Sequence, residues 1–185
     1  GFGKEHMKAF DPAAMVGFNM DHMKAFDPSA VAGFGKEHMK AFDPSAVRGF
    51  SMDHMKAFDP AAMGGFNMDH MKAFDPGSMG GFGKDHMAAF DTGAMFGFQA
   101  DHLGNFTNDA IGGIDMDHMK AFNPMAMGGF NAGHFGKMDA TMMGAFDSEK
   151  IGNFDPMAMG GFDMAHMAAF DVGAMQGFKA DMLGN

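Results

Sequence analysis

The chain contains no cysteine, tryptophan or tyrosine among its 185 residues. Without cysteine it has no disulfide framework, no thiolate nucleophile and no thiolate metal ligand. Basic residues are also scarce: 13 Lys and Arg stand against 23 Asp and Glu, and the formal net charge is −10. Because nucleic-acid binding depends on clustered positive charge at the phosphates, this balance argues against a nucleic-acid partner.

Long apolar segments and catalytic signatures are missing as well. No apolar run approaches the roughly 18 residues of a membrane span, and no secretory signal is present. The sequence has no EF-hand loop, no phosphate-binding loop and no glycine-rich nonapeptide of the calcium-binding kind. Ser and Thr are few, and identical units do not build one asymmetric active site. We therefore predict that the protein is not an enzyme.

The abundant residues are Gly (28), Met (26) and Phe (23), and they recur in a fixed order. The chain reads GFGKEHMKAFDPAAMV, then GFNMDHMKAFDPSAVA, then GFGKEHMKAFDPSAVR, and this sixteen-residue register continues without insertion to the end. Each unit consists of two octads of the form small residue, Phe, cap residue, two variable residues, His or Ala, Met, variable residue. We name the first half of each unit the His octad and the second half the Asp octad.

The array is predicted to be a single domain over residues 1–185. Residues 1–80 are nearly identical units with eight basic and ten acidic side chains, whereas residues 81–185 have diverged and carry five basic and thirteen acidic ones. Recent duplication explains this division. A contact surface made of the repeated lysines is the alternative: Lys8, Lys24, Lys40, Lys56 and Lys72. Because the chain begins in register and stops one residue into a new unit, we expect a processed product or the ordered part of a longer array.

The spacing of the two apolar positions favours a short helix in each octad. Phe and Met are five residues apart, then three, and this parity places them on opposite faces of a strand. In residues 10–15, Asp11 is a preferred N-cap, Pro12 suits the first helical position, and Phe10 with Met15 forms a hydrophobic staple across the cap. The glycine that follows is expected at the helix end in a left-handed conformation. The predicted caps of this kind are Asp11, Asp27, Asp43, Asp59, Asp75, Asn123 and Asp155.

In the His octads, the imidazole falls where a capping box has Glu or Gln. A helix of this length is unstable alone and must be stabilised by stacking on its neighbours. The predicted fold is therefore an all-α solenoid of very short capped helices, with a core of Phe and Met and with small first-position residues that allow close approach of the coils. A β-solenoid is the alternative if bends interrupt each strand.

The octad resembles the tandem repeats of the form A-L-T-x-x-Q-I-x found in some large bacterial surface and secreted proteins. Phe stands for Leu, Asp or Asn for Thr, His or Ala for Gln, and Met for Ile, position by position in residues 9–16. The resemblance covers essentially the whole chain by register rather than by identity. It implies a secreted or surface repeat protein, extracellular or periplasmic, without assigned catalytic residues.

The histidines all occupy the sixth position of a His octad, and many are flanked by Met. Imidazole and thioether ligands suit copper, and imidazole also suits zinc, so one hypothesis is a ladder of metal sites. Its candidate ligands are His6, His22, His38, His54, His70, His86, His102, His118, His134 and His166, with Met20, Met52, Met68, Met116 and Met164. The competing interpretation is that these histidines cap helices and were copied with the repeat.

The favoured functional hypothesis is a structural or interaction protein: a scaffold, filament subunit or accessory subunit of a larger assembly, with protein partners or self-association. The fixed register and the lack of recognisable chemistry motivate it. Two alternatives remain open. One is the metal-binding module, and the other is a protein whose Phe and Met surface contacts a hydrophobic cofactor or a membrane complex.

Overall fold

A computed structural model describes residues 3–184, and each octad in this range forms one short helix. The His octads give the following helices: α1 (Lys4–Lys8), α2 (Met20–Ala25), α4 (Lys36–Ala41), α6 (Met52–Ala57), α7 (Met68–Ala73), α8 (Lys84–Ala88), α10 (Ala100–Gly104), α12 (Met116–Ala121), α13 (Ala132–Phe135), α14 (Ser148–Ile151), α15 (Met164–Ala169) and α16 (Ala180–Leu183). The Asp octads give four α-helices, α3 (Pro28–Val31), α5 (Pro44–Val47), α9 (Thr92–Met95) and α11 (Asn108–Ile111). The other Asp octads give 3₁₀ helices: η1 (Pro12–Gly17), η2 (Pro60–Gly65), η3 (Pro76–Gly81), η4 (Pro124–Gly129), η5 (Ala140–Ala145), η6 (Pro156–Gly161) and η7 (Ala174–Gly177).

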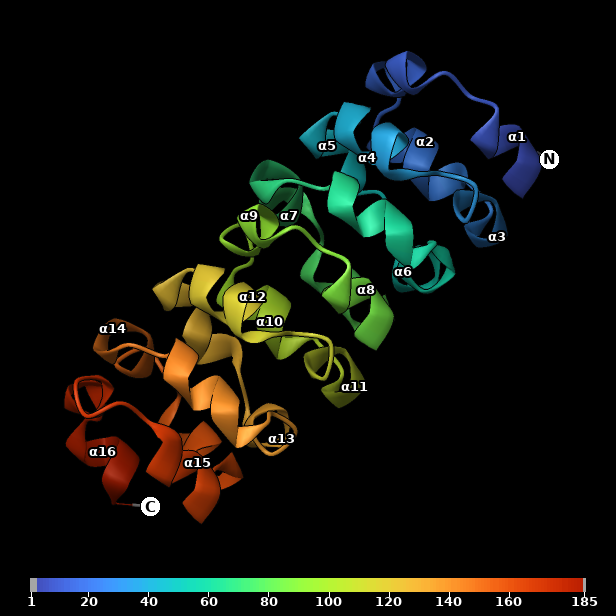
Figure 1. Ribbon diagram of the computed structural model, residues 1–185. Helices are drawn as coiled ribbons and strands as arrows, with labels where there is room; N and C mark the ends of the chain where they lie inside the picture. Colours follow the sequence, from blue (N-terminus) through green and yellow to red (C-terminus); the bar gives the residue numbers. More distant parts are fainter. Residues whose placement is uncertain (1–2, 185) are drawn as a thin grey trace.

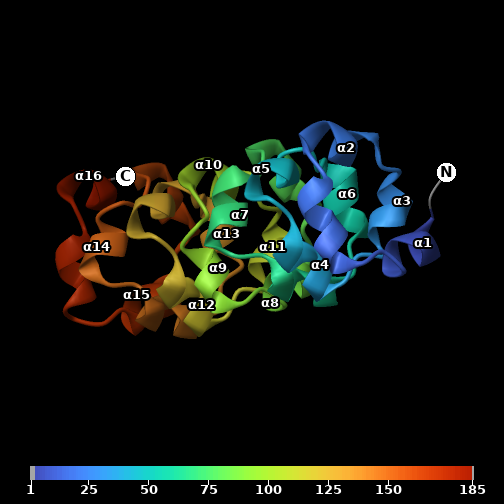
Figure 2. The same cartoon turned by 90° about the horizontal axis from the view of Figure 1, so that it is seen from above.

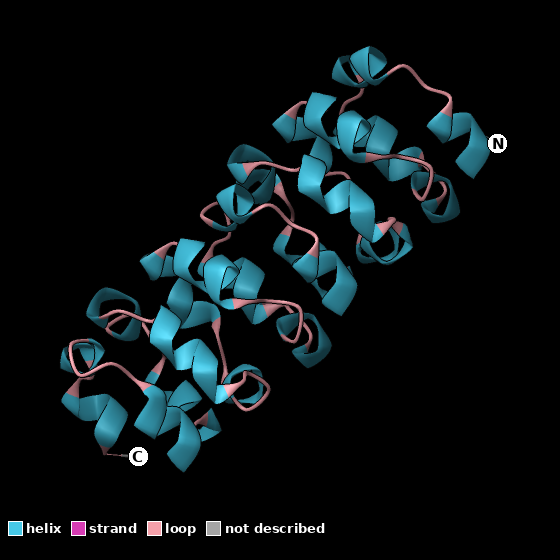
Figure 3. Ribbon diagram, in the orientation of Figure 1, coloured by secondary structure: helices cyan, strands magenta, loops and turns pink. Residues whose placement is uncertain are grey.

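These helices wind into one elongated solenoid with its ends at opposite extremes (Figures 1 and 2). Each helix between the first and last coils packs against the helices three octads before and after it, as α4 packs against η1 and η2. One turn therefore contains three octads, and three stacks of helices run along the solenoid. Residues 3–184 contain only helices and connecting loops (Figure 3). The prediction of an all-α solenoid is confirmed, and the alternative of a β-solenoid is wrong.

Local sequence defines where each helix begins and ends. In most Asp octads the cap side chain accepts a hydrogen bond from the backbone N–H two residues on, as Asp11 does from Ala13 at 2.9 Å. Proline follows at the first helical position, where its missing N–H costs nothing. The helix commonly ends at the next Phe, whose backbone is extended, for example φ −67° and ψ 142° at Phe26. The same Phe then precedes the next cap and points into the core.

One turn of the solenoid contains three octads, whereas the sequence repeat contains two, and this difference determines which types of octad pack together. Because three is odd, the octad one turn away is always of the other type. Every packed pair of helices that joins neighbouring coils in the described chain combines a His octad with an Asp octad, as in the stack α5, α7, α9, α12, η5 and α15. The sixteen-residue period therefore reflects an alternation along each stack as well as along the chain.

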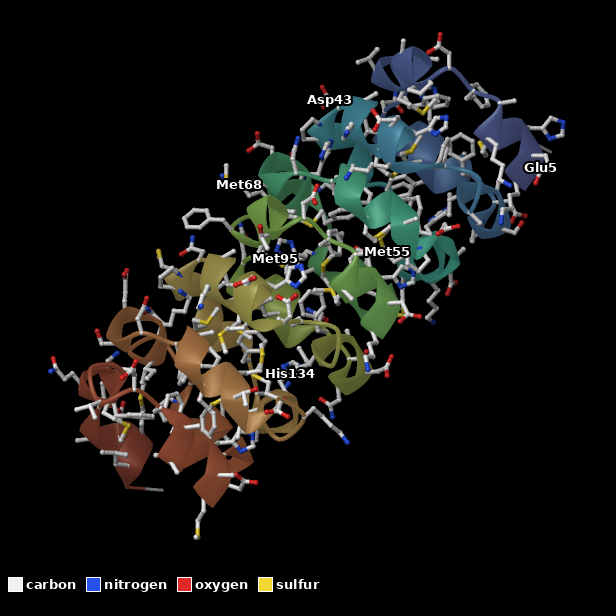
Figure 4. The ribbon with its side chains drawn as sticks, viewed as in Figure 1. Glu5, Asp43, Met55, Met68, Met95 and His134 are labelled. Carbon is white, nitrogen blue, oxygen red and sulfur yellow. The ribbon has the colours of Figure 1, made fainter. Side chains whose placement is uncertain are left out.

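The core consists of Met from the seventh position and Phe from the second. Met55 and Met95 are fully buried, whereas Glu5 and Asp43 lie on the surface (Figure 4). Successive Phe rings meet edge to face along the chain, as Phe34 and Phe42 do with centroids 5.6 Å apart and an interplanar angle of 85°. Such edge-to-face pairs are a favourable geometry for aromatic quadrupoles.

Glycine at the first position of the His octads is required by close approach of the coils. A Cβ on Gly49 would overlap the carbonyl oxygen of Met20 in the preceding coil. The same overlap would occur in every other His octad from residue 33 onward that has glycine at its first position. The expected left-handed helix ends are wrong, because no described residue has a positive φ. The prediction of small residues that allow close coil contact describes these glycines correctly.

Candidate functional site

The third helical residue of each His octad lies where its side chain can reach back to the cap. The Nδ1 atom of His38 accepts a hydrogen bond from the backbone N–H of Gly35 at 3.0 Å, and that of His70 accepts one from Asn67 at 3.1 Å. Where the cap residue is Asn, Asp or Ser, its side chain in turn accepts from the histidine N–H, as Asn67 does from His70 at 3.1 Å. Imidazole thus replaces Glu or Gln in a capping box, as the sequence predicts.

The second ring nitrogen reaches into the neighbouring coil. The Nε2 atom of His70 lies 2.9 Å from the carbonyl oxygen of Phe42, and that of His102 lies 3.0 Å from the carbonyl oxygen of Phe74. A carbonyl only accepts and a backbone N–H only donates, so Nε2 carries the proton and Nδ1 is unprotonated. We name this arrangement the histidine clasp. Its members are His38, His54, His70, His86, His102, His118, His134 and His166, each bonded to the residue 28 positions earlier.

The clasp histidines are largely shielded from solvent, and His70, His102 and His134 are each only 1% exposed. No described buried side-chain nitrogen or oxygen lacks a hydrogen-bond partner. Burial lowers the pKa of His134, and its hydrogen bond to the Phe106 carbonyl opposes this effect. His6 and His22 belong to the first coil, where their rings are exposed and their Nδ1 atoms accept from Gly3 and Asn19.

The ten histidines do not form one continuous ladder. Because neighbouring His octads are two octads apart and a turn contains three, consecutive histidines lie in different stacks. Within one stack the order is His22, His70, His118 and His166, and an Asp octad lies between each pair. Two histidines of one stack are therefore separated by two coils.

The candidate metal ligands are correspondingly dispersed. Within residues 3–184, no three or more His, Asp or Glu side chains gather where they could hold a metal ion. In each clasp, both imidazole nitrogens already bond to the backbone. Of the flanking methionines, Met52 and Met164 are exposed, and Met20, Met68 and Met116 are half-buried. The geometry supports the capping interpretation, and copper or zinc binding stays a prediction without structural support.

Two His octads carry another residue at the sixth position. The Nζ atom of Lys150 donates to the carbonyl of Lys120 at 3.1 Å and lies 3.6 Å from the Asp147 carboxylate, so lysine also joins its cap to the neighbouring coil. Met182 makes only the contact with its own cap, in which its sulfur accepts a hydrogen bond from the Lys179 N–H at 3.5 Å. Lysine therefore contacts the carboxylate of its cap residue rather than the cap N–H, whereas Met182 accepts from the cap N–H.

The predicted Asp-octad caps all lie at the N-caps of their helices. Their side chains accept backbone hydrogen bonds at Asp11, Asp27, Asp43, Asp59, Asp75, Asn123 and Asp155. The hydroxyl and N–H of Ser29 hold the pKa of Asp27 below its usual value, and Ser45 does the same for Asp43. These carboxylates are explained by helix capping.

The repeated lysines do not gather on one surface. Lys8, Lys40, Lys56 and Lys72 each lie within 4 Å of an acidic side chain three residues earlier, as Lys40 does with Glu37 at 2.9 Å. Because consecutive His octads lie in different stacks, these lysines are distributed around the solenoid. Exposed pairs of this kind contribute little stability. This distribution does not support a single lysine contact surface.

Shallow grooves recur between the coils at equivalent places. One lies beside Lys8, His38 and Asp59, and the corresponding groove beside Lys120, Lys150 and Asp171 is larger, at about 560 Å³ against about 340 Å³. A further groove of about 520 Å³ at the last coil is lined by Met157, Met159 and Met167 among others.

Comparisons with known proteins do not assign the chain to a group. No known protein family matches it, and no curated protein has a similar sequence. No helix in residues 3–184 is long and apolar enough to cross a lipid bilayer. Sequence reasoning identified the imidazole as a cap, but it missed the Phe carbonyl as the second partner, because nothing in the octad shows how many octads complete a turn.

Proposed function

We propose that the protein is a structural spacer: an elongated solenoid that holds other parts of an assembly at a fixed separation. One observation carries this proposal. The histidine clasps tie successive coils together from His38 to His166, so the polar side chains that could have formed a reactive site instead connect the backbone of one coil to the next.

The packing supports the same role. Met and Phe fill the interior, and the glycines of the His octads bring neighbouring coils into backbone contact. A solenoid built in this way resists bending, because any bend must open the contacts on one side. Thirteen acidic side chains stand against five basic ones in residues 81–185, and this net negative charge favours solubility of an extended molecule.

The partners of such a spacer are proteins or further copies of the chain, and the secreted setting implied by the octad resemblance is part of the proposal. No clustering of ligands favours the metal-binding alternative. The tightly packed Phe and Met core likewise leaves the cofactor alternative without a specific observation.

Small-angle X-ray scattering and electron microscopy of the purified chain test the proposal. We expect an elongated particle whose length increases in proportion when sixteen-residue units are added within residues 1–80. A variant with two added units is the sharpest comparison, since it changes length without changing the unit. A compact particle, or a length that does not follow the number of units, would contradict the spacer role.

A further inference from the structure

The two backbone partners of each histidine clasp are both satisfied in only one protonation state of the ring. The ring lies between a backbone N–H on Nδ1 and a backbone carbonyl on Nε2, so the neutral Nε2–H form satisfies both. Adding a proton to Nδ1 places two donors face to face at the cap. The helix then loses its capping bond, or the ring turns away and the bond to the neighbouring coil is lost as well.

Three octads in the second half of the chain have a carboxylate at the cap. The Nδ1 atom of His118 lies 3.0 Å from the Asp115 carboxylate, and that of His166 lies 2.8 Å from the Asp163 carboxylate. The Nζ atom of Lys150 likewise lies 3.6 Å from the Asp147 carboxylate. Lysine at this place shows that a buried cation is accommodated when the cap residue is Asp.

The other clasps have an uncharged cap residue. It is Gly35 for His38, Ser51 for His54, Asn67 for His70, Gly83 for His86, Gln99 for His102 and Asn131 for His134. None of these caps places a carboxylate beside Nδ1. The Ser51 hydroxyl, however, lies 2.8 Å from the Nδ1 of His54 and can accept a hydrogen bond from it after protonation. Most of these clasps lie in residues 33–105, so the two kinds are unevenly distributed along the solenoid.

His70 and His118 allow a direct comparison, because they lie in one stack on either side of α9. The helices packed against His70 carry Asp43 and Arg48 from the α5 octad and Asp91 from the α9 octad, while its own octad has Asp69 and Lys72. The helices packed against His118 carry the same Asp91 together with Lys137 and Asp139, and its own octad has Asp117 and Lys120. The surroundings are thus similar in charge, and the cap residue is the main difference: Asn67 against Asp115.

We propose that the histidine clasps form a graded acid-sensitive device, in which clasps capped by Gly, Asn or Gln open on protonation and clasps capped by Asp remain closed. Acid then loosens the coils of residues 33–105 first, while the coils joined by His118, Lys150 and His166 stay in contact. This inference goes beyond the spacer role and does not depend on it, because it concerns the coil contacts alone.

Exchanging the two caps tests the proposal on the intact chain. Amide hydrogen exchange at the cap N–H groups of residues 67 and 115 is measured at pH 7.5 and pH 5.0 and corrected for intrinsic exchange. In the unaltered protein, protection at residue 67 is expected to fall about tenfold in acid, the size of one lost hydrogen bond. Protection at residue 115 should change by less than about twofold.

The variants Asn67→Asp and Asp115→Asn are close in size to the native residues and should interchange these responses. His70→Gln is the matched control, because a neutral amide can accept the cap N–H and donate to the Phe42 carbonyl at both pH values. It should remove the acid response at residue 67 while retaining protection at pH 7.5.

Imidazole nitrogen chemical shifts provide an independent readout of the same state. At pH 7.5 they should report the neutral Nε2–H form for His70. Protonation of His118 at pH 5.0 without loss of protection at residue 115 would support the proposal. Equal acid responses at residues 67 and 115, or cap variants that leave both responses unchanged, would overturn it.

Discussion

The two octads of the repeat form helices of similar length, yet they depend on different contacts. An Asp octad is defined mostly by its own residues: a carboxylate cap, a proline and an alanine at the sixth position, as in Asp59, Pro60 and Ala62. A His octad depends on the coil beneath it, through glycine at its first position and imidazole at its sixth. One half of the repeat is specified locally and the other half by its neighbours.

Disrupting the alternation of His and Asp octads along each stack should cause the largest loss of unfolding free energy. Deletion of residues 57–64 removes a single octad. Three successive pairs of packed helices then each combine two octads of the same type, and beyond them the alternation of His and Asp octads resumes. We expect a loss of roughly 3–6 kcal/mol of unfolding free energy, because clasps and glycine contacts at the junction are lost together. Deletion of residues 49–64 removes two octads, keeps the alternation and should lose only the stability of one unit.

Urea denaturation followed by circular dichroism compares the two deletions. Equal destabilisation by the eight-residue and sixteen-residue deletions would contradict a turn of three octads. A clear difference would confirm that the parity of the turn matters more than the number of residues removed.

Substitution of the glycine at the first position of a His octad should cause the next largest loss of unfolding free energy. Gly97→Ala introduces a Cβ that overlaps the Met68 carbonyl oxygen, and we expect destabilisation of about 3 kcal/mol from the forced separation of the coils. Ala89→Gly makes the reverse change at the first position of an Asp octad and should cost about 1 kcal/mol or less. Thermal unfolding of both variants is the measurement, and similar costs would mean that close approach is not the reason for glycine.

A histidine clasp should contribute less to the free energy of unfolding than the close contact between a first-position glycine and the backbone of the preceding coil. His70→Ala removes two hydrogen bonds and leaves the Phe42 carbonyl without its partner, for an expected loss of about 2 kcal/mol. His22→Ala is the control in the same stack, because this exposed ring caps its own helix in the first coil, and its loss should be about 1 kcal/mol or less. Equal losses from chemical denaturation would show that the inter-coil bond adds nothing.

The smallest effect is expected for a local cap of the Asp octad. Asp59→Ala removes a hydrogen bond to the Ala61 N–H and should destabilise by about 1 kcal/mol, whereas Asp59→Asn should be nearly neutral because the amide oxygen also caps. Hydrogen exchange should confine the change to η2. If protection from exchange also fell in neighbouring coils, the stability of the Asp octads would depend on more than their own residues.

The octad of residues 145–152 departs from the pattern at two places at once. It has Ala145 where the other described His octads have glycine, and Lys150 where most have histidine. The lysine donates to the carbonyl of Lys120, two residues before the Phe that a histidine would reach. The groove beside it is larger than its counterpart beside His38, at about 560 Å³ against about 340 Å³.

A second compensation is found in the core of the preceding octads. Met138 occupies a second position that usually holds Phe, and Phe135 occupies a seventh position that usually holds Met. The Phe135 ring stacks on Phe162 with centroids 4.3 Å apart and an interplanar angle of 27°, instead of the usual edge-to-face contact. The exchange keeps one aromatic side chain and one methionine in this part of the core, and volume-conserving exchanges of this kind are well tolerated.

The sequence by itself determined the unit, the caps and the core of this protein. Asp or Asn before the helix, proline after it and the Phe and Met spacing are short-range signals, and a chain segment of eight residues contains all of them. Histidine as a cap at the third helical position is also a local property, since the ring and the N–H it accepts from are three residues apart.

Only the tertiary structure decided how many octads complete a turn. That number depends on the summed angles between helices and on the contacts of residues about 24 to 29 positions apart, which no pattern within one octad encodes. The turn of three then determined the partner of each imidazole, the requirement for glycine and the separation of the histidines into three stacks. The difference between the two octads is therefore visible in the sequence, but its physical reason lies in the packing of one coil on the next.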